Sequence, residues 1–283
     1  MTTADRLNDL ITAKEDMKSA IIEKGVTPEG GLSTYADAIR QIEGSGSGGE
    51  GSIKLPDGTK FMNSTFTNVP FFDTSAITDM SQMFYNCYNL VFIPLFDTSN
   101  VTNMYYMFYM GYDTTGGGLF PRSNLISVPL FDTSNVTNMA CMFCACDKLT
   151  EIPAFNTSKV QRVADMFDGC RSLTTIPELD FTNVDYMSGT STGFLYGLHE
   201  LTNVGGFRNL GYKEHLTGHI RLSSAKLTTE SIRNIFNLLY DRATAGYSII
   251  KIYIDSNAYN TNNFTDELIA IATSKGWNVS VLS

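Results

Sequence analysis

The sequence is poor in charged residues, in histidine and in long apolar runs. Charged residues make up 17% of its 283 residues, three are histidines, and the net charge is −9. No cluster of lysine and arginine occurs, and an acidic surface repels phosphate backbones, so we expect no nucleic-acid binding. Three histidines leave little material for histidine-based catalysis, and we expect no enzyme activity and no cofactor.

Membrane and secretion signals are also missing. No apolar run approaches the roughly 20 residues that span a bilayer, so membrane insertion is not expected. The start, Met1 to Arg6, lacks the basic region and apolar stretch of a secretory signal. The protein is therefore expected either to act in the cytoplasm or to leave the cell without such a signal. What is present, 43% hydrophobic and 12% aromatic residues, suits a globular chain with a substantial core.

The first 43 residues predict two short amphipathic helices, over about 4–24 and 33–42, separated by a turn rich in glycine and proline. Such helices cannot bury their apolar stripes alone, so we expect this module to attach to a partner, to copies of itself or to the rest of the chain. The residues expected at that contact are Leu7, Leu10, Ile11, Met17, Ile21, Tyr35 and Ile39. Residues 44–52, almost all glycine and serine, form a flexible linker and mark a domain boundary.

Residues 53–210 repeat. Equivalent positions are Ile77, Val101, Val136, Val160 and Val184, and their spacings are 24, 35, 24 and 24 residues. The longer spacing equals one repeat plus an 11-residue insertion between Phe108 and Val128. A constant period with one insertion is typical of a solenoid, in which each unit contacts only its neighbours.

Each repeat contains a predicted strand, a turn and a predicted helical segment. In one unit, Leu149 to Phe155 is expected to be extended with its apolar residues inward, and Val136 to Phe143 to form one or two helical turns. Residues 211–283 predict longer α/β capping coils, with strands over 219–222, 248–254 and 277–282 and helices over 228–242 and 265–275. The expected fold is thus an α/β leucine-rich-repeat solenoid preceded by a small α-helical module.

The repeat motif resembles a known family. Met142-Phe143, Cys146, Leu149 and Ile152-Pro153, together with the Phe-Asp-Thr-Ser-Asn-Val-Thr-Asn-Met run at 96–104 and 131–139, are similar to BspA-like (Treponema-type) leucine-rich repeats, especially their Mycoplasma-lipoprotein variant. Residues 267–277 resemble the cap behind such repeats in phage proteins. The segment from Leu7 to Ile39 resembles the helical module at the start of phage tail-fibre proteins.

The resemblance implies adhesion or receptor binding without catalysis. It favours a phage virion protein of the tail-fibre or receptor-binding type, attached to other virion proteins through its N-terminal helices and bound to a host-surface glycan or protein. A homo-oligomer is expected, with a trimer favoured. The alternatives are a bacterial surface adhesin of the BspA-like class and a structural capsid or tail decoration protein without a ligand.

The candidate ligand contacts are tyrosines near the insertion, since tyrosine combined with glycine, serine and threonine is typical of binding surfaces. The alternative is that some of them pack the coils. They are Tyr85, Tyr88, Tyr105, Tyr106, Tyr109 and Tyr112.

No metal site is expected. Cys87, Cys146 and Cys170 occupy one repeat position and are interpreted as buried packing thiols; the alternative is a disulfide between Cys146 and Cys170 on neighbouring coils. His215 and His219 lack an evident third ligand. Asp73, Asp97, Asp132 and Asn156 form a column that could hold calcium, but turn capping is favoured because asparagine serves a turn as well as aspartate does.

Overall fold

The computed structural model describes eight segments of the chain. They are residues 54–65, 67–69, 72–111, 123–187, 194–195, 197–222, 225–255 and 264–282. The predicted helical module (1–43), the linker (44–52) and most of the insertion therefore lie outside the described residues.

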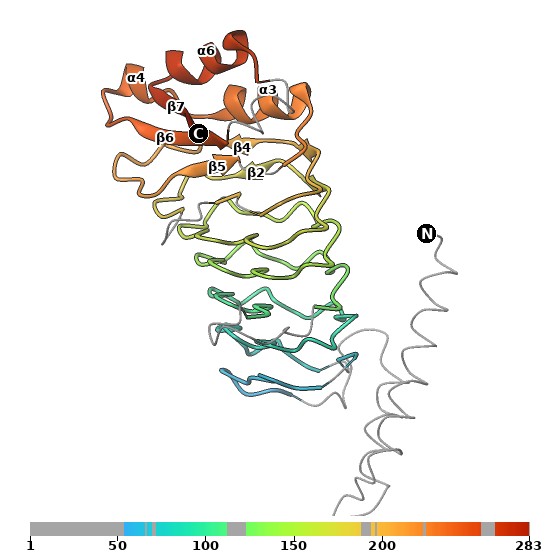
Figure 1. The fold of residues 1–283 in the computed structure, drawn as a ribbon. Coiled ribbons are helices and arrows are strands. Elements are labelled where there is room, and N and C mark those ends of the chain that lie inside the picture. The colour runs from blue at the N-terminus through green and yellow to red at the C-terminus, as the bar shows by residue number, and fades with distance from the viewer. Residues whose placement is uncertain are drawn as a thin grey trace, which may run out of the picture.

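The described residues form a stack of flattened coils that ends in a helical and stranded cap (Figure 1). Successive coils run parallel, one repeat apart, and are joined by single β-bridges rather than by long strands. One series of bridges runs along most of the stack, and it links Asp79, Asn103, Asn138, Arg162, Tyr186 and Thr217 in that order. A stack of parallel coils is thus observed, whereas its assignment to the leucine-rich-repeat class stays a prediction.

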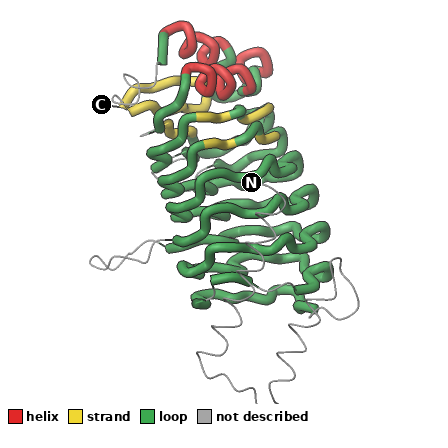
Figure 2. The backbone as a smooth tube through the Cα atoms, turned by 90° about the vertical axis from the view of Figure 1, so that its right-hand side faces the viewer, coloured by secondary structure: helices red, strands yellow, loops and turns green. Residues whose placement is uncertain are grey.

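The helical turns predicted inside each repeat are wrong. In Figure 2 the coils are drawn mainly as loops and turns, with short strands near the cap, and the helices of the described residues occur only in the cap. The reason is that the backbone N–H groups bond to the next coil: Phe84 N donates to Met107 O at 2.9 Å and Phe108 N to Met142 O at 2.9 Å. Residues in the left-handed region, such as Gln82 (φ 57°) and Tyr106 (φ 56°), interrupt any helix at these positions.

Two columns of phenylalanine rings fill the core of the stack. The rings of Phe84, Phe108, Phe143 and Phe167 follow one another at 5.6 to 6.1 Å and are within 6° of parallel. Phe96, Phe131 and Phe155 form the second column at 6.5 Å. Because all these rings are buried, each coil presents its neighbour with an equivalent apolar surface.

The extended segment predicted at 149–155 is only partly regular. Leu149, Ile152 and Phe155 are buried as predicted, but a single bridge, Glu151 to Thr175, represents the strand there. Further along, short parallel strands appear: β1 (Thr175–Ile176) pairs with β3 (Asn203–Val204), and β2 (Leu179–Asp180) pairs with β4 (Phe207–Arg208).

The cap is a three-stranded parallel sheet covered by helices. The sheet order is β5 (Ile220–Leu222), β6 (Ile250–Asp255) and β7 (Trp277–Leu282). Two helices contact each other above it, α3 (Thr229–Leu238) and α6 (Asp266–Ser274), and each begins at a threonine N-cap, Thr228 and Thr265. The elements predicted for residues 211–283 are therefore confirmed in type and order.

One predicted boundary in the cap is wrong. The helix expected over 228–242 ends at Leu238, and a separate short helix, α4 (Arg242–Ala245), follows. Leu239 is extended (ψ 140°), and Tyr240 N donates to Leu210 O of the preceding coil at 2.9 Å. Asp241 then caps the new helix through Thr244 N, so tertiary contacts override the continuous helical pattern.

Removing one ring of the phenylalanine column is expected to destabilise the whole stack. Phe143 is fully buried between Phe108 and Phe167, so Phe143→Ala should lower the free energy of unfolding by about 3–5 kcal/mol. Urea unfolding followed by circular dichroism measures the change. Leu130→Ala is the control, because Leu130 is 59% exposed, and a similar loss there would contradict the stacking argument.

Candidate ligand-binding groove

The series of β-bridges places six side chains in one line along the stack. We call the line from Asp79 to Thr217 the bridge column; register partners on neighbouring parallel coils lie on the same face. Two residues further along each coil, a second column begins, and it contains Ser81, Tyr105, Ala140 and Ala164. Asn138 of the bridge column and Tyr105 and Ala140 of the second column line the same groove, so the two columns lie side by side.

An open groove of about 750 Å³ lies across these columns. Its wall groups come from four successive coils and from the chain that enters the cap. They are Tyr105, Asn138, Ala140, Arg162, Asp185, Tyr186, His215 and Thr217. Of these, the sequence predicted only Tyr105 as a contact residue.

The groove exists because side-chain size falls along the second column. Tyr105 is followed on the next coils by Ala140 and then by Ala164, which are 6% and 4% exposed. In the bridge column, size rises in the same direction, from Asn138 to Arg162 and Tyr186. Of the two alanines, Ala140 lines the groove, together with the larger residues Arg162 and Tyr186. The change from tyrosine to alanine at one repeat position is a signal that an aligned reading of the repeats could have found.

The structure brings four of the six predicted tyrosines together. Tyr85, Tyr105, Tyr106 and Tyr109 form one cluster. The rings of Tyr85 and Tyr109 are stacked, with centroids 4.9 Å apart, and those of Tyr105 and Tyr106 are tilted by 54°, with centroids 4.1 Å apart. Burial, followed by the hydrogen bond with Tyr105, raises the pKa of Tyr106.

The other two predicted tyrosines are Tyr88 and Tyr112. Tyr88 is partly buried against the core, with its hydroxyl beside Gly111. Tyr112 lies outside the described residues, as do the seven residues predicted for attachment, Leu7 to Ile39. The contact role of the tyrosines stays a prediction.

A buried arginine holds one wall of the groove. Arg242 is 0% exposed, and its guanidinium donates to the carbonyls of Gly211 (2.6 Å), Lys213 (3.0 Å) and Glu214 (3.0 Å). Burial lowers its pKa. This short segment leads directly to His215, so the cap fixes the backbone that carries the far wall of the groove. Sequence reasoning missed Arg242, because nothing in its neighbourhood marks it as buried.

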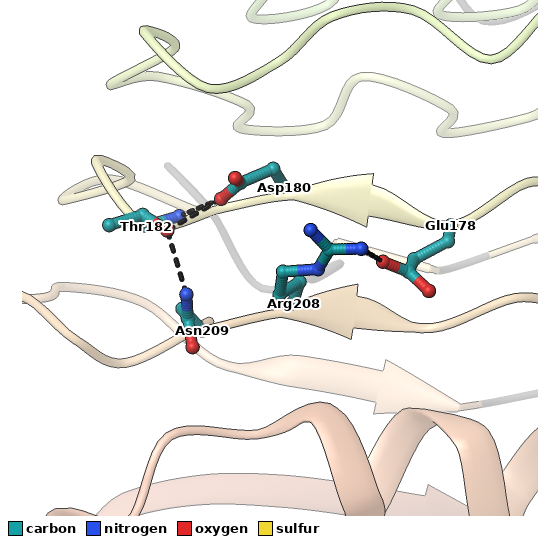
Figure 3. Close-up of polar contacts among 5 residues, drawn as sticks. All are labelled: Glu178, Asp180, Thr182, Arg208 and Asn209. Atoms are coloured by element: carbon teal, nitrogen blue, oxygen red, sulfur yellow. Dashed lines mark hydrogen bonds and ion pairs between the residues drawn. The ribbon is translucent and has the colours of Figure 1, made fainter.

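The aspartate column caps turns, as predicted. Asp73, Asp97, Asp132 and Asn156 each accept a hydrogen bond from the backbone N–H of the serine two residues on, at 2.9 to 3.2 Å. Serine hydrogen bonds lower the pKa of Asp73 and Asp132. In Figure 3, Asp180 makes the same turn with Thr182, and Asn209 of the next coil donates to the Thr182 hydroxyl at 3.0 Å. An ion pair between Glu178 and Arg208 joins the same two coils (Figure 3).

The cysteines are packing thiols, as predicted. All five are buried, and none forms a disulfide within the described residues. Cys87, Cys146 and Cys170 donate to the carbonyls of Phe61, Phe108 and Phe143 of the preceding coils at 3.0 to 3.1 Å, and burial raises the pKa of all three thiols.

His215 and His219 do not form a pair. His215 is exposed in the groove, whereas His219 packs edge-on against Tyr253 at 5.0 Å. Within the described segments, no group of three or more histidine, cysteine or acidic side chains is placed to hold a metal ion. None of the helices in these segments is long and apolar enough to cross a membrane.

The repeats match a known family. Residues 58–115 and 119–194 match the family described as Mycoplasma protein of unknown function, DUF285. The match covers the coils and agrees with the resemblance to Mycoplasma-type repeats, but it carries no information on a tail fibre. No curated protein and no solved structure is significantly similar to the chain.

A carboxylate at the start of the stack predicts a pH dependence of stability. Asp57 accepts hydrogen bonds from Thr78 N (2.9 Å), Thr78 Oγ1 (2.6 Å) and Asp79 N (3.0 Å) of the next coil. The Thr78 hydroxyl and these N–H groups lower the pKa of Asp57 from 3.8 to about 2. A lowered pKa means that the stabilisation is present above about pH 4 and is lost as the pH falls towards 2.

The Asp57→Asn variant is therefore expected to be less stable than the unmodified protein at about pH 6, and the difference should shrink at about pH 2. Urea midpoints at the two pH values measure this. A Glu151→Gln variant provides a control carboxylate that is exposed and makes no such side-chain bond. An equal response of the two variants would contradict the assignment to Asp57.

Proposed function

We propose that the protein is a non-enzymatic virion component, of the tail-fibre or receptor-binding type, whose coils bind a host-surface ligand. The observation that carries the binding role is the groove, where aromatic, amide, cationic and hydroxyl groups converge from successive coils. Ligand sites commonly combine contact area with a few placed polar groups. Tyr105 and Tyr186 offer the area, and Asn138, Arg162 and Thr217 offer the polar groups.

The attachment role rests on the sequence. Residues 1–43 carry two apolar stripes, and a glycine/serine linker separates them from the coils, which suits a particle anchor and a separately oriented binding surface. Oligomerisation through Leu7, Leu10 and Ile11, with a trimer favoured, is part of this proposal.

A bacterial surface adhesin is the second candidate. The match of residues 58–115 and 119–194 to a family described as a Mycoplasma protein favours it, because Mycoplasma is a bacterium. The same groove would then bind its ligand from the surface of the cell that makes the protein.

Loss of one groove ring is expected to weaken binding to cells. Tyr186 is 36% exposed in the groove, so Tyr186→Ala should reduce binding of labelled full-length protein to cells of the producing culture by about tenfold or more. Flow cytometry over a protein concentration series measures the affinity.

Two tyrosine variants act as controls for that experiment. Tyr212→Ala removes a ring that is 46% exposed in the cap and should leave binding unchanged. Tyr109→Ala removes a ring of the tyrosine cluster outside the groove. A loss with Tyr109→Ala and none with Tyr186→Ala would place the contact in the cluster and contradict the groove.

The location of the protein separates the two candidates. Immunogold electron microscopy of a producing culture, with antibody raised against the full chain, is expected to label phage particles at the tail. Label on intact cells with bare particles would overturn the virion role and support the adhesin. Label over the capsid would indicate a decoration protein.

A further inference from the structure

A local hydrogen-bond pattern repeats along the bridge column and then stops inside the groove. Asp79 accepts from Ser81 N at 2.7 Å, Asn103 from Tyr105 N at 3.1 Å, and Asn138 from Ala140 N at 3.1 Å. In each of these three coils, the side chain of the bridge column thus accepts a hydrogen bond from the backbone N–H two residues further along the chain. This is the Asx turn that aspartate and asparagine form readily.

In the next coil the residue at this position is Arg162. A guanidinium has donors only, so it cannot accept a bond from Ala164 N. Among the described residues, no other acceptor bonds to that N–H. The coil itself keeps its register, since Cys141 N donates to Ala164 O at 2.8 Å just as Tyr106 N donates to Ala140 O at 3.1 Å. The Ala164 N–H therefore occupies the place equivalent to that of Ala140 N–H, but without its acceptor.

Arg162, two residues before Ala164 in the chain, offers further donors. Arg162 lines the groove, is exposed, and makes no ion pair within the described segments. A buried backbone N–H without an acceptor costs free energy, which an incoming acceptor would recover. Carboxylate oxygens suit this place best, because they replace the missing Asx oxygen and match the planar donors of arginine at the same time.

We propose that the groove binds an acidic saccharide, whose carboxylate accepts hydrogen bonds from the Arg162 guanidinium and from Ala164 N–H. The inference rests on the proposed binding role of the groove and names the chemical group that it recognises. The Tyr186 ring, which is the bridge partner of Arg162, supplies a flat amphipathic surface for the sugar ring.

Other groups in the groove restrict the kinds of acidic saccharide that would fit it. Asn138 and Thr217 supply hydrogen-bonding groups for sugar hydroxyls on either side of Arg162 and Tyr186. Asp185 also lines the groove, and its carboxylate would repel a second negative charge. The ligand is therefore expected to present one carboxylate among neutral hydroxyls, rather than the dense negative charge of an acidic peptide.

The test titrates the full-length, isotopically labelled protein with glucuronate and follows the backbone amides by NMR spectroscopy. Methyl glucoside is the neutral sugar control, and acetate is the carboxylate without a sugar. Glucuronate is expected to move the Ala164 amide proton downfield in a saturable manner, methyl glucoside to leave it unmoved, and acetate to act at least tenfold more weakly.

The Arg162→Asn variant makes this test more specific. It places at position 162 the residue that the preceding coil has at the equivalent position, Asn138, which accepts the hydrogen bond of Ala140 N. It should restore an acceptor for Ala164 N–H, keep or raise the melting temperature, and lower glucuronate affinity by about tenfold or more. Arg171→Asn makes the same charge change on an exposed residue of the same coil outside the groove, and it should leave affinity unchanged.

An unmoved Ala164 amide, or equal losses of affinity in the two arginine variants, would overturn the proposal. Equal affinity for acetate and glucuronate would overturn its saccharide part. Cell binding that Tyr186→Ala abolishes, with no response to glucuronate, would leave the binding role of the groove intact and reject only the acidic sugar.

Discussion

Backbone hydrogen bonding between successive coils is the constraint on which the rest of this structure depends. Donors such as Phe84 N and Phe108 N bond to the coil that follows, not to their own turn. This is possible because residues such as Gln82 and Tyr106 adopt left-handed conformations that turn the chain. The phenylalanine columns then pack ring on ring, and each coil becomes a template for its neighbour.

A template of this kind turns small sequence changes into surface features. Because each coil carries an equivalent residue at the same position of the stack, a change of that residue in one coil alters the surface only at that coil. The step from Tyr105 to Ala140 opens the groove, and the step from Asn138 to Arg162 replaces a hydrogen-bond acceptor with donors. The groove is therefore a local departure from the repeat, while the repeat itself provides the rigid support. Arg242 extends that support into the cap, where it fixes the backbone before His215.

The sequence predicted well what depends on one repeat and its apolar pattern. Cys146 and Cys170 are buried thiols, Asp97 and Asp132 cap turns, and the cap strands and helices occur in the predicted order. The helical turns of the repeats were wrong because apolar spacing alone does not distinguish a helix from a tight turn bonded to another coil. The predicted helix end at residue 242 was wrong, because the helix stops at Leu238 and Tyr240 N donates to Leu210 O of the preceding coil.

By itself, the sequence determined the length of the repeat, which residues of successive repeats are equivalent, and which positions are buried. All three follow from an apolar pattern that recurs every 24 residues. Only the tertiary structure decided which exposed residues meet. Tyr105, Arg162 and His215 are far apart in the chain. They line the same groove because successive coils stack directly on one another, joined by backbone hydrogen bonds. The missing acceptor at Ala164 likewise becomes visible only when the coils are compared in register.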